Sequence, residues 1–309
     1  MFHILIRAAA ACVACGLWSA TVDAAEIRMD PSRAAVDGAV LEGKINAGDF
    51  DKFKSFLLNG NNVVEIYLAS PGGAVVDAMK IGLLIRTLKL STVVPSKALT
   101  NQSRESAIAG HDLKDPQADY KCASACFFIF VAGVHRSSDA DGNAILGIHS
   151  PSLSESALNK LSYDQVAAAD NRIRTAIENY LKMMDVPAKY AEDMFSVPKS
   201  KTQWIRNDEF EADFAGFIPT LRGWVAARCG PGSGVESKNG EALKPTNTEQ
   251  SAVERSMSDG ATKENQARLK CERNVQDELA LRGDALRKQS GEIPQPTLDG
   301  LGISPALPK

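Results

Sequence analysis

The chain lacks a strong excess of either charge and contains few histidines. It has 35 lysine and arginine residues and 38 acidic residues, so the formal net charge over 309 residues is only −3. No long basic stripe occurs, and composition therefore gives no support for a nucleic-acid-binding surface. Apolar residues make up 44% and charged residues 24%, as in ordinary globular proteins. The length allows one large domain or two smaller ones.

Long apolar runs are also missing after the first residues. In residues 1–24, Arg7 is the only charge before a short apolar run that ends near Trp18. Small residues follow at Val22 and Ala24, as they do before a leader-peptidase cleavage site. The run is shorter than the roughly 20 residues that a membrane span needs. We therefore expect 1–24 to be a signal peptide, and the mature protein to be periplasmic or secreted without a stable membrane span.

Cysteine is scarce, with six residues in all, two of them inside the expected signal peptide. An even number in an oxidising compartment favours disulfide bonds, and four cysteines allow three pairings. The C-x3-C spacing of the first pair, with no histidine near the other two, is poor for zinc. We expect no metal and no cofactor. The four remaining cysteines are Cys122, Cys126, Cys229 and Cys271.

Aromatic residues are absent beyond Trp224, where the sequence becomes rich in glycine, proline and polar residues. That change predicts a boundary near residue 228, with a domain at 25–228 and a largely disordered, low-complexity tail at 229–309. Val275, Leu279 and Leu286 indicate one helix at about 262–289. We expect it to be exposed or loosely docked, and a partner-binding helix is the alternative. A Cys229–Cys271 bond would tether this tail to the domain.

Strand and helix patterns alternate through the domain. A β-rich run at 63–68 ends in the turn Ser-Pro-Gly-Gly at 70–73, and a helical pattern follows directly. Such an order predicts an α/β fold in which helical crossovers join parallel strands. A polar stretch of unusual length, 97–121, interrupts the pattern. Further strands are expected at 91–94 and 144–148, and further helices at 127–132 and 166–184.

Ser124 stands between two cysteines in KCASACFFIFVAG, at the start of the apolar helix. A helix N-cap is the ordinary role of serine there, and a nucleophile with a nearby base is the alternative. Of the three histidines beyond residue 24, His111 and His135 are expected at the solvated surface. His149 ends a buried strand instead. Ligands in α/β folds bind beyond the carboxyl ends of strands, where His149 and the Gly72-Gly73 turn could meet Ser124.

These motifs, in this order, resemble the proteolytic subunits of the Clp proteases in the ClpP/crotonase superfamily. The set is Ser-Pro-Gly-Gly, a serine that opens an apolar helix ending in Ala-Gly, and then Gly-Ile-His-Ser-Pro. The similarity spans roughly residues 38–222 and is nearest to secreted, periplasmic Clp-like proteins. It implies a fold of repeated β-α-β units around a parallel sheet. It also implies a serine peptidase that acts on peptides or unfolded proteins, with a homo-oligomer as a further possibility.

The resemblance implies a role for individual residues as well. Ser124 becomes the nucleophile and His149 its general base, while the backbone N–H groups of Gly73 and Ala125 form an oxyanion hole. Asp193, in the segment 191–196, is the implied third member of the triad, and Asp185 and Glu192 are the fallbacks.

The chain departs from the family in the cysteines around Ser124, an insertion at 97–118 and the C-terminal tail. A second hypothesis is therefore a catalytically inert relative that binds a peptide or partner in the same cleft. A crotonase-type acyl-CoA enzyme and a Ser/Lys hydrolase fit the sequence less well.

Overall fold

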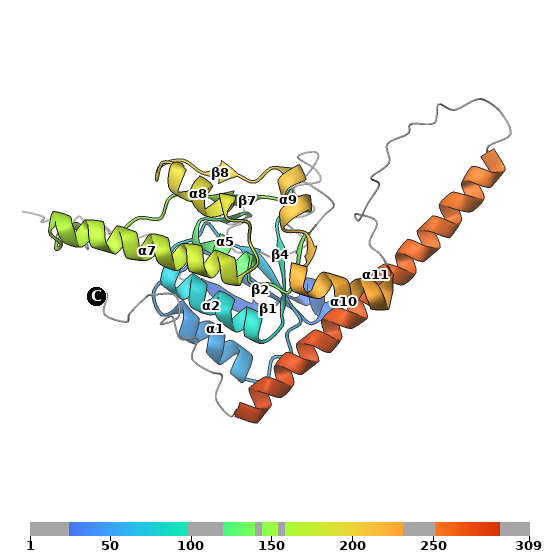
Figure 1. Cartoon of the computed structure of the whole chain (residues 1–309). Helices are drawn as coiled ribbons and strands as arrows, with labels where there is room; N and C mark the ends of the chain where they lie inside the picture. The colour runs from blue at the N-terminus through green and yellow to red at the C-terminus, as the bar shows by residue number, and fades with distance from the viewer. Residues whose placement is uncertain (1–24, 98–119, 140–143, 154–157, 231–250, 291–309) are drawn as a thin grey trace, which may run out of the picture.

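The computed structural model describes residues 25–97, 120–139, 144–153, 158–230 and 251–290. The expected signal peptide, His111 and most of the polar insertion lie outside these residues. The described chain is a mixed α/β structure (Figure 1). Within the described ranges, no helix is long and apolar enough to cross a membrane.

The larger sheet has six strands in the order β1-β2-β3-β4-β6-β9. The four central strands run parallel, which confirms the predicted α/β class with parallel strands. Both edge strands, β1 and β9, are antiparallel to their neighbours. The strands are β1 (Glu26–Met29), β2 (Gly38–Glu42), β3 (Glu65–Ala69), β4 (Ser91–Val94), β6 (His135–Ser138) and β9 (Gly216–Phe217).

A second, three-stranded sheet carries the residues of interest. It consists of β5 (Cys122–Ala123), β7 (Leu146–Ile148) and β8 (Gln203–Trp204), in that order. β5 and β7 are parallel, and β8 runs antiparallel to β7. A parallel bridge between Ser70 and Cys122 connects this sheet to the residue that follows β3. The two sheets are thus joined where the Ser-Pro-Gly-Gly turn begins.

The helices cover the larger sheet and enclose a buried central helix. Every residue of α5 (Ala125–Phe130) is buried, as its apolar sequence predicts. Gly82 of α2 lets Tyr180 of α7 come close, and the Tyr180 hydroxyl donates a 2.7 Å hydrogen bond to the Phe128 carbonyl of α5. The other helices are α1 (Asp49–Leu58), α2 (Val75–Thr87), α7 (Tyr163–Met183), α8 (Lys189–Ser196), α9 (Asn207–Asp213), α10 (Pro219–Cys229), α11 (Ser251–Ser290) and the 3-10 helix η1 (Pro31–Val36).

The tail helix is longer than predicted, and part of it is buried. α11 begins at Ser251 and crosses α10, and its first turns extend beyond the folded body (Figure 1). Val275 and Leu279 are buried in an apolar cluster with Val134, Phe217 and Val225. A disulfide joins Cys229 to Cys271, and Arg228 forms a 2.6 Å ion pair with Glu278. The expectation of an exposed or loosely docked helix is therefore wrong for this segment, although Leu286 is exposed.

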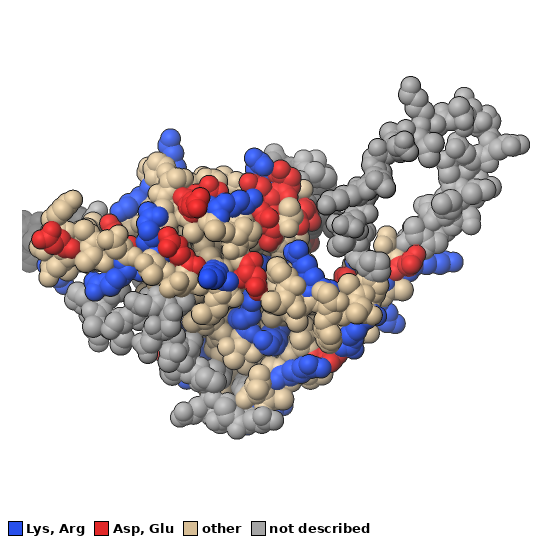
Figure 2. All heavy atoms as spheres, viewed as in Figure 1, with Lys and Arg blue, Asp and Glu red and all other residues tan. Residues whose placement is uncertain are grey.

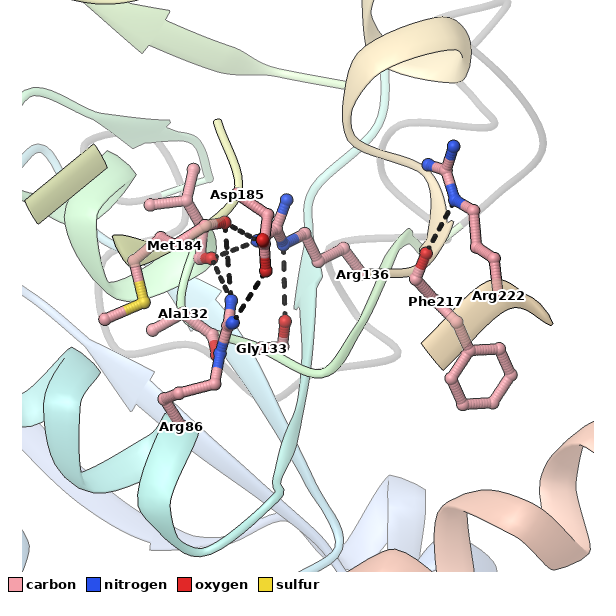
Figure 3. A network of polar contacts seen from close by, with 9 residues as sticks. Arg86, Ala132, Gly133, Arg136, Met184, Asp185, Phe217 and Arg222 are labelled. Atoms are coloured by element: carbon pink, nitrogen blue, oxygen red, sulfur yellow. Dashed lines mark hydrogen bonds and ion pairs between the residues drawn. The ribbon is translucent and has the colours of Figure 1, made fainter. Parts of the chain in front are cut away.

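The expectation that His135 lies at the solvated surface is also wrong, because its Nδ1 is buried and its ring packs against Phe217. His135 and Arg136 lie on β6, which the sequence pattern did not indicate. Arg136 is 1% exposed, and burial lowers its pKa to about 9. The guanidinium groups of Arg86 and Arg136 converge on carbonyls at the end of α5 and α7 (Figure 3), and Arg86 also pairs with Asp185 at 3.2 Å. Cations at a helix C-terminus stabilise its unpaired carbonyls.

Charge on the surface is mixed, as the near-neutral composition suggests. On the face shown in Figure 2, acidic side chains gather over α9 and basic ones are scattered elsewhere, so no field of a single sign extends across the whole face.

Candidate functional site

Three chain segments meet at the carboxyl ends of neighbouring strands. In the parallel β5–β7 pair, Ala123 lies opposite Gly147, so Ser124 comes directly after its strand's last paired residue and His149 comes two residues after Gly147. The Ser70–Cys122 bridge brings the turn after β3 to the same edge. Neighbouring strands lie about 5 Å apart. The strand pairing therefore places Ser124, the residues after β7 and the glycine turn at one edge of the small sheet.

Ser124 has an unusual backbone conformation. It lies between β5 and α5 with φ 57° and ψ −123°. Non-glycine residues rarely take positive φ, and such residues cluster at functional sites. Ser124 occupies the N-cap position, yet its side chain makes no capping hydrogen bond. The hydroxyl is thus not used in the structural role that the sequence most readily suggests, and Ser124 is only half-buried.

The glycine turn approaches Ser124 very closely. Gly72 has φ 97°, and a Cβ atom built on it would lie 2.5 Å from the Ser124 Cβ and 2.8 Å from the Ala125 nitrogen. Gly73 has φ 140°, and a Cβ there would collide with the Ile45 carbonyl. Only glycine satisfies both the positive φ and the close approach. Gly72 is therefore required by the packing of this turn against the serine, and Gly73 by its packing against Ile45.

Two backbone donors beside the serine are unpaired. Within the described part of the chain, the N–H groups of Gly73 and Ala125 donate no hydrogen bond. The turn itself is fixed, because the Ile45 N–H donates to the Gly72 carbonyl at 2.9 Å and the Ala74 N–H donates to the Ile45 carbonyl at 2.8 Å. Ala125 begins α5, where N–H groups have no partner within the helix. Preorganised donors of this kind can bind a developing oxyanion.

His149 is half-buried, and its ring is oriented by the backbone. Its Nδ1 lies 2.9 Å from the carbonyl oxygen of Ser150. A carbonyl can only accept, so Nδ1 carries the proton in this contact and Nε2 is left as an acceptor. No hydrogen bond joins Ser124 to His149 in the structure as described. The two residues follow neighbouring strands of the small sheet.

The implied third triad member does not contact the histidine. Asp193 is half-buried on α8, and no hydrogen bond connects its carboxylate to the described ring of His149. The end of α8 is nevertheless close, since the Ser150 N–H donates to the Val197 carbonyl at 3.3 Å. Of the fallbacks, Asp185 is paired with Arg86, and Glu192 is exposed.

A disulfide brackets the serine. Cys122 of β5 and Cys126 of α5 are bonded, with Cα atoms 5.3 Å apart, and both residues are fully buried. The bond closes a loop of Ala123, Ser124 and Ala125. Both disulfides are among the pairings that the cysteine count allowed. Elsewhere in the described ranges, no cluster of His, Cys, Asp or Glu has the arrangement of a metal site.

Trp204 is a residue near the site that sequence reasoning missed. Its strand, β8, pairs with β7 so that Trp204 lies opposite Gly147. The indole ring covers Gly147 and is still 41% exposed. A two-residue strand has no detectable alternation, and only the strand pairing reveals this position.

Comparison with known proteins adds no identification. No protein-family model matches the chain, and no curated protein matches it in sequence.

Proposed function

We propose that this protein is an exported serine hydrolase, most simply a peptidase, with a ClpP/crotonase-like fold. One observation carries the proposal. Ser124 sits at a positive-φ strand-to-helix junction with its hydroxyl free of any capping bond. Strained strand–serine–helix turns present the nucleophile in other hydrolases. The unpaired N–H groups of Gly73 and Ala125, which flank the same turn, support this assignment.

The proposed reaction is acyl transfer through a covalent intermediate. Ser124 Oγ attacks the substrate carbonyl carbon while its proton moves to His149 Nε2. The carbonyl oxygen becomes an oxyanion and accepts hydrogen bonds from the two backbone donors. Collapse breaks the C–N bond, the amine leaves with the proton from His149, and an ester on Ser124 remains. Water then gives a proton to His149 and attacks the ester, releasing the acid and restoring the serine.

For His149 to act as a base through Nε2, a hydrogen-bond partner must hold the proton on Nδ1. We assign this role to the Ser150 carbonyl, which lies 2.9 Å away. Asp193 is the second candidate, because the end of α8 is bonded to Ser150. A backbone carbonyl orients the ring but stabilises a developing imidazolium less than a carboxylate does. A Ser124–His149 dyad is thus the simplest form of the proposed site.

Export is part of the proposal. The short apolar run and small residues of 1–24 support a cleaved signal peptide. Two disulfides are compatible with an oxidising compartment. The expected substrates there are peptides or unfolded proteins, and no cofactor is required by the chemistry.

An inert peptide-binding protein is the second candidate. It is favoured by the missing hydrogen bond between Ser124 and His149, since a nucleophile must reach its base. An inert relative would keep the cleft and the glycine turn but would not form an acyl-enzyme.

An active-site fluorophosphonate separates the two candidates. The mature protein is expected to be labelled at Ser124, with labelling lost in Ser124→Ala and reduced at least about a hundredfold in His149→Ala. Circular dichroism should confirm that the variants are folded. Absence of labelling in folded wild-type protein would reject the hydrolase in favour of the binding protein.

A further inference from the structure

Trp204 lies on the same face of the small sheet as the histidine. Along each strand, side chains alternate between the two faces. Leu146 and Ile148 of β7 are buried in the main core, so Gly147 and the following His149 face the other way. Trp204 is the direct partner of Gly147 and is therefore the diagonal neighbour of His149. Diagonal neighbours lie about 7–8 Å apart, within reach of an aromatic ring.

The indole is held firmly, and much of it remains open. The Ile205 N–H donates to the Leu146 carbonyl at 2.8 Å, which fixes the backbone beside Trp204. One edge of the ring, Cε3 and Cζ3, rests on Gly147, where a Cβ atom would lie only 2.9 Å from each. Trp204 is nevertheless 41% exposed, so part of the side chain is open to solvent.

A second exposed tryptophan provides a useful contrast. Trp224, on α10, is 36% exposed, and the guanidinium groups of Arg228 and Arg282 lie 4.8 and 6.0 Å from its ring centroid. Cations of the same chain thus occupy the faces of that ring. Trp204 makes no comparable ring or cation contact with any described residue. Trp204 lies opposite Gly147 in the small sheet, on the strand next to β7, whereas Trp224 lies on α10.

We propose that Trp204 forms the wall of a subsite for an apolar, preferentially aromatic, side chain of the substrate. The inference rests on the proposed hydrolase and adds a substrate class to it. The Ser124 N–H bonds to the Gly147 carbonyl, so the residue under the indole is also the residue that positions the nucleophile. A side chain next to the scissile carbonyl would stack on the ring and exclude water from it. Aromatic pairs of this kind contribute beyond their buried area.

The test compares N-acetyl-phenylalanine and N-acetyl-alanine p-nitrophenyl esters as substrates of the mature protein. We expect wild type to favour the phenylalanine ester by about tenfold or more in kcat/KM, mainly through KM. Trp204→Ala should lose this preference while still hydrolysing the alanine ester, and Trp204→Phe should restore most of it. Trp224→Ala is the matched control and should keep the wild-type preference. An unchanged preference in Trp204→Ala would overturn the inference and leave the hydrolase intact.

A binding measurement keeps the two proposals distinguishable if no ester is hydrolysed. In the mature chain with Trp224→Phe, Trp204 is the single tryptophan. Titration with N-acetyl-phenylalaninamide should then change its emission in a saturable way, with a much weaker response to N-acetyl-alaninamide. That result would support the aromatic subsite although the hydrolase had failed. Equal or absent responses would overturn the subsite.

Discussion

The main-chain N–H of Ser124 donates a 2.9 Å hydrogen bond to the carbonyl of Gly147, two residues before His149. The bond holds the turn with the proposed nucleophile against β7, the strand that precedes the proposed base. Because Trp204 covers the same glycine, one short segment of β7 relates the serine, the histidine and the indole to one another. The predictions below test how strictly the site depends on this packing.

Gly72→Ala should abolish labelling of Ser124 by a fluorophosphonate. The new methyl group would lie 2.5 Å from the Ser124 Cβ, and φ 97° is unfavourable for alanine. The serine turn must shift, so we expect a loss of at least about a hundredfold in labelling rate, since small misplacements cost that much. Gly223→Ala is the control, because nothing lies within 4 Å of a Cβ there. Equal labelling of the two variants would contradict the close packing that we describe.

The two disulfides should separate stability from activity. Chain-entropy arguments give about 4 kcal/mol for the Cys229–Cys271 bond, which spans 42 residues, and about 2 kcal/mol for Cys122–Cys126, which spans four. Replacing the first pair with alanine should therefore lower the urea midpoint more, while leaving Ser124 labelling near wild type. Replacing the second pair should reduce labelling strongly, because it frees the turn around Ser124. The opposite ranking of labelling would refute a positioning role for Cys122–Cys126.

Asp193→Asn tests which group orients the histidine. With Nδ1 bonded to the Ser150 carbonyl, the variant should label within about threefold of wild type, whereas loss of an orienting carboxylate costs about 10⁴-fold in established triads. Asp185→Asn serves as a comparison, since that carboxylate pairs with Arg86. A loss of several thousandfold in Asp193→Asn alone would establish a triad in place of the dyad.

His135 should make stability sensitive to acid. Burial against Phe217 lowers its pKa to about 4, below the ordinary value of about 6.5. The folded state therefore favours the neutral ring, and this contribution is complete above pH 6.5 and is lost as the pH falls toward 4. We expect this contribution to the free energy of unfolding to reach about 2 kcal/mol. Partial exposure of His135 keeps it below the value that the whole pKa shift would give. Urea unfolding of wild type and His135→Phe at pH 7 and pH 4.5 measures it. A constant difference between the two proteins would disprove the effect.

Local sequence patterns anticipated much of the core. The β-rich run before Ser70 and the apolar run after Ser124 became β3 and the buried α5, because each carries its own periodicity and turn residues. The positions of Gly72 and His149 after strands, and of Ser124 at the start of a helix, followed from the same patterns. Parallel strands necessarily place such residues at one edge.

Other features had no local signal. β6 and β8 are too short or too polar to show alternation, so His135 was wrongly placed at the surface and Trp204 was not placed. The burial of Val275 and Leu279 depends on Val134 and Phe217, which are far away in the chain. The polar residues around Val275 and Leu279 predicted an exposed helix. Only their apolar contacts in the folded chain show that this part of α11 is buried.

The sequence by itself determined the strand before Ser70, the glycine turn, the serine that opens the apolar helix and the histidine that follows a buried strand. These features depend on neighbours within a few residues, where backbone and side-chain preferences act directly. Tertiary structure alone decided the positive φ of Ser124, the pairing of the cysteines, the carbonyl that holds His149 and the indole over Gly147. Each of these is a contact or constraint set by packing between distant segments, and no local pattern encodes which segments will meet.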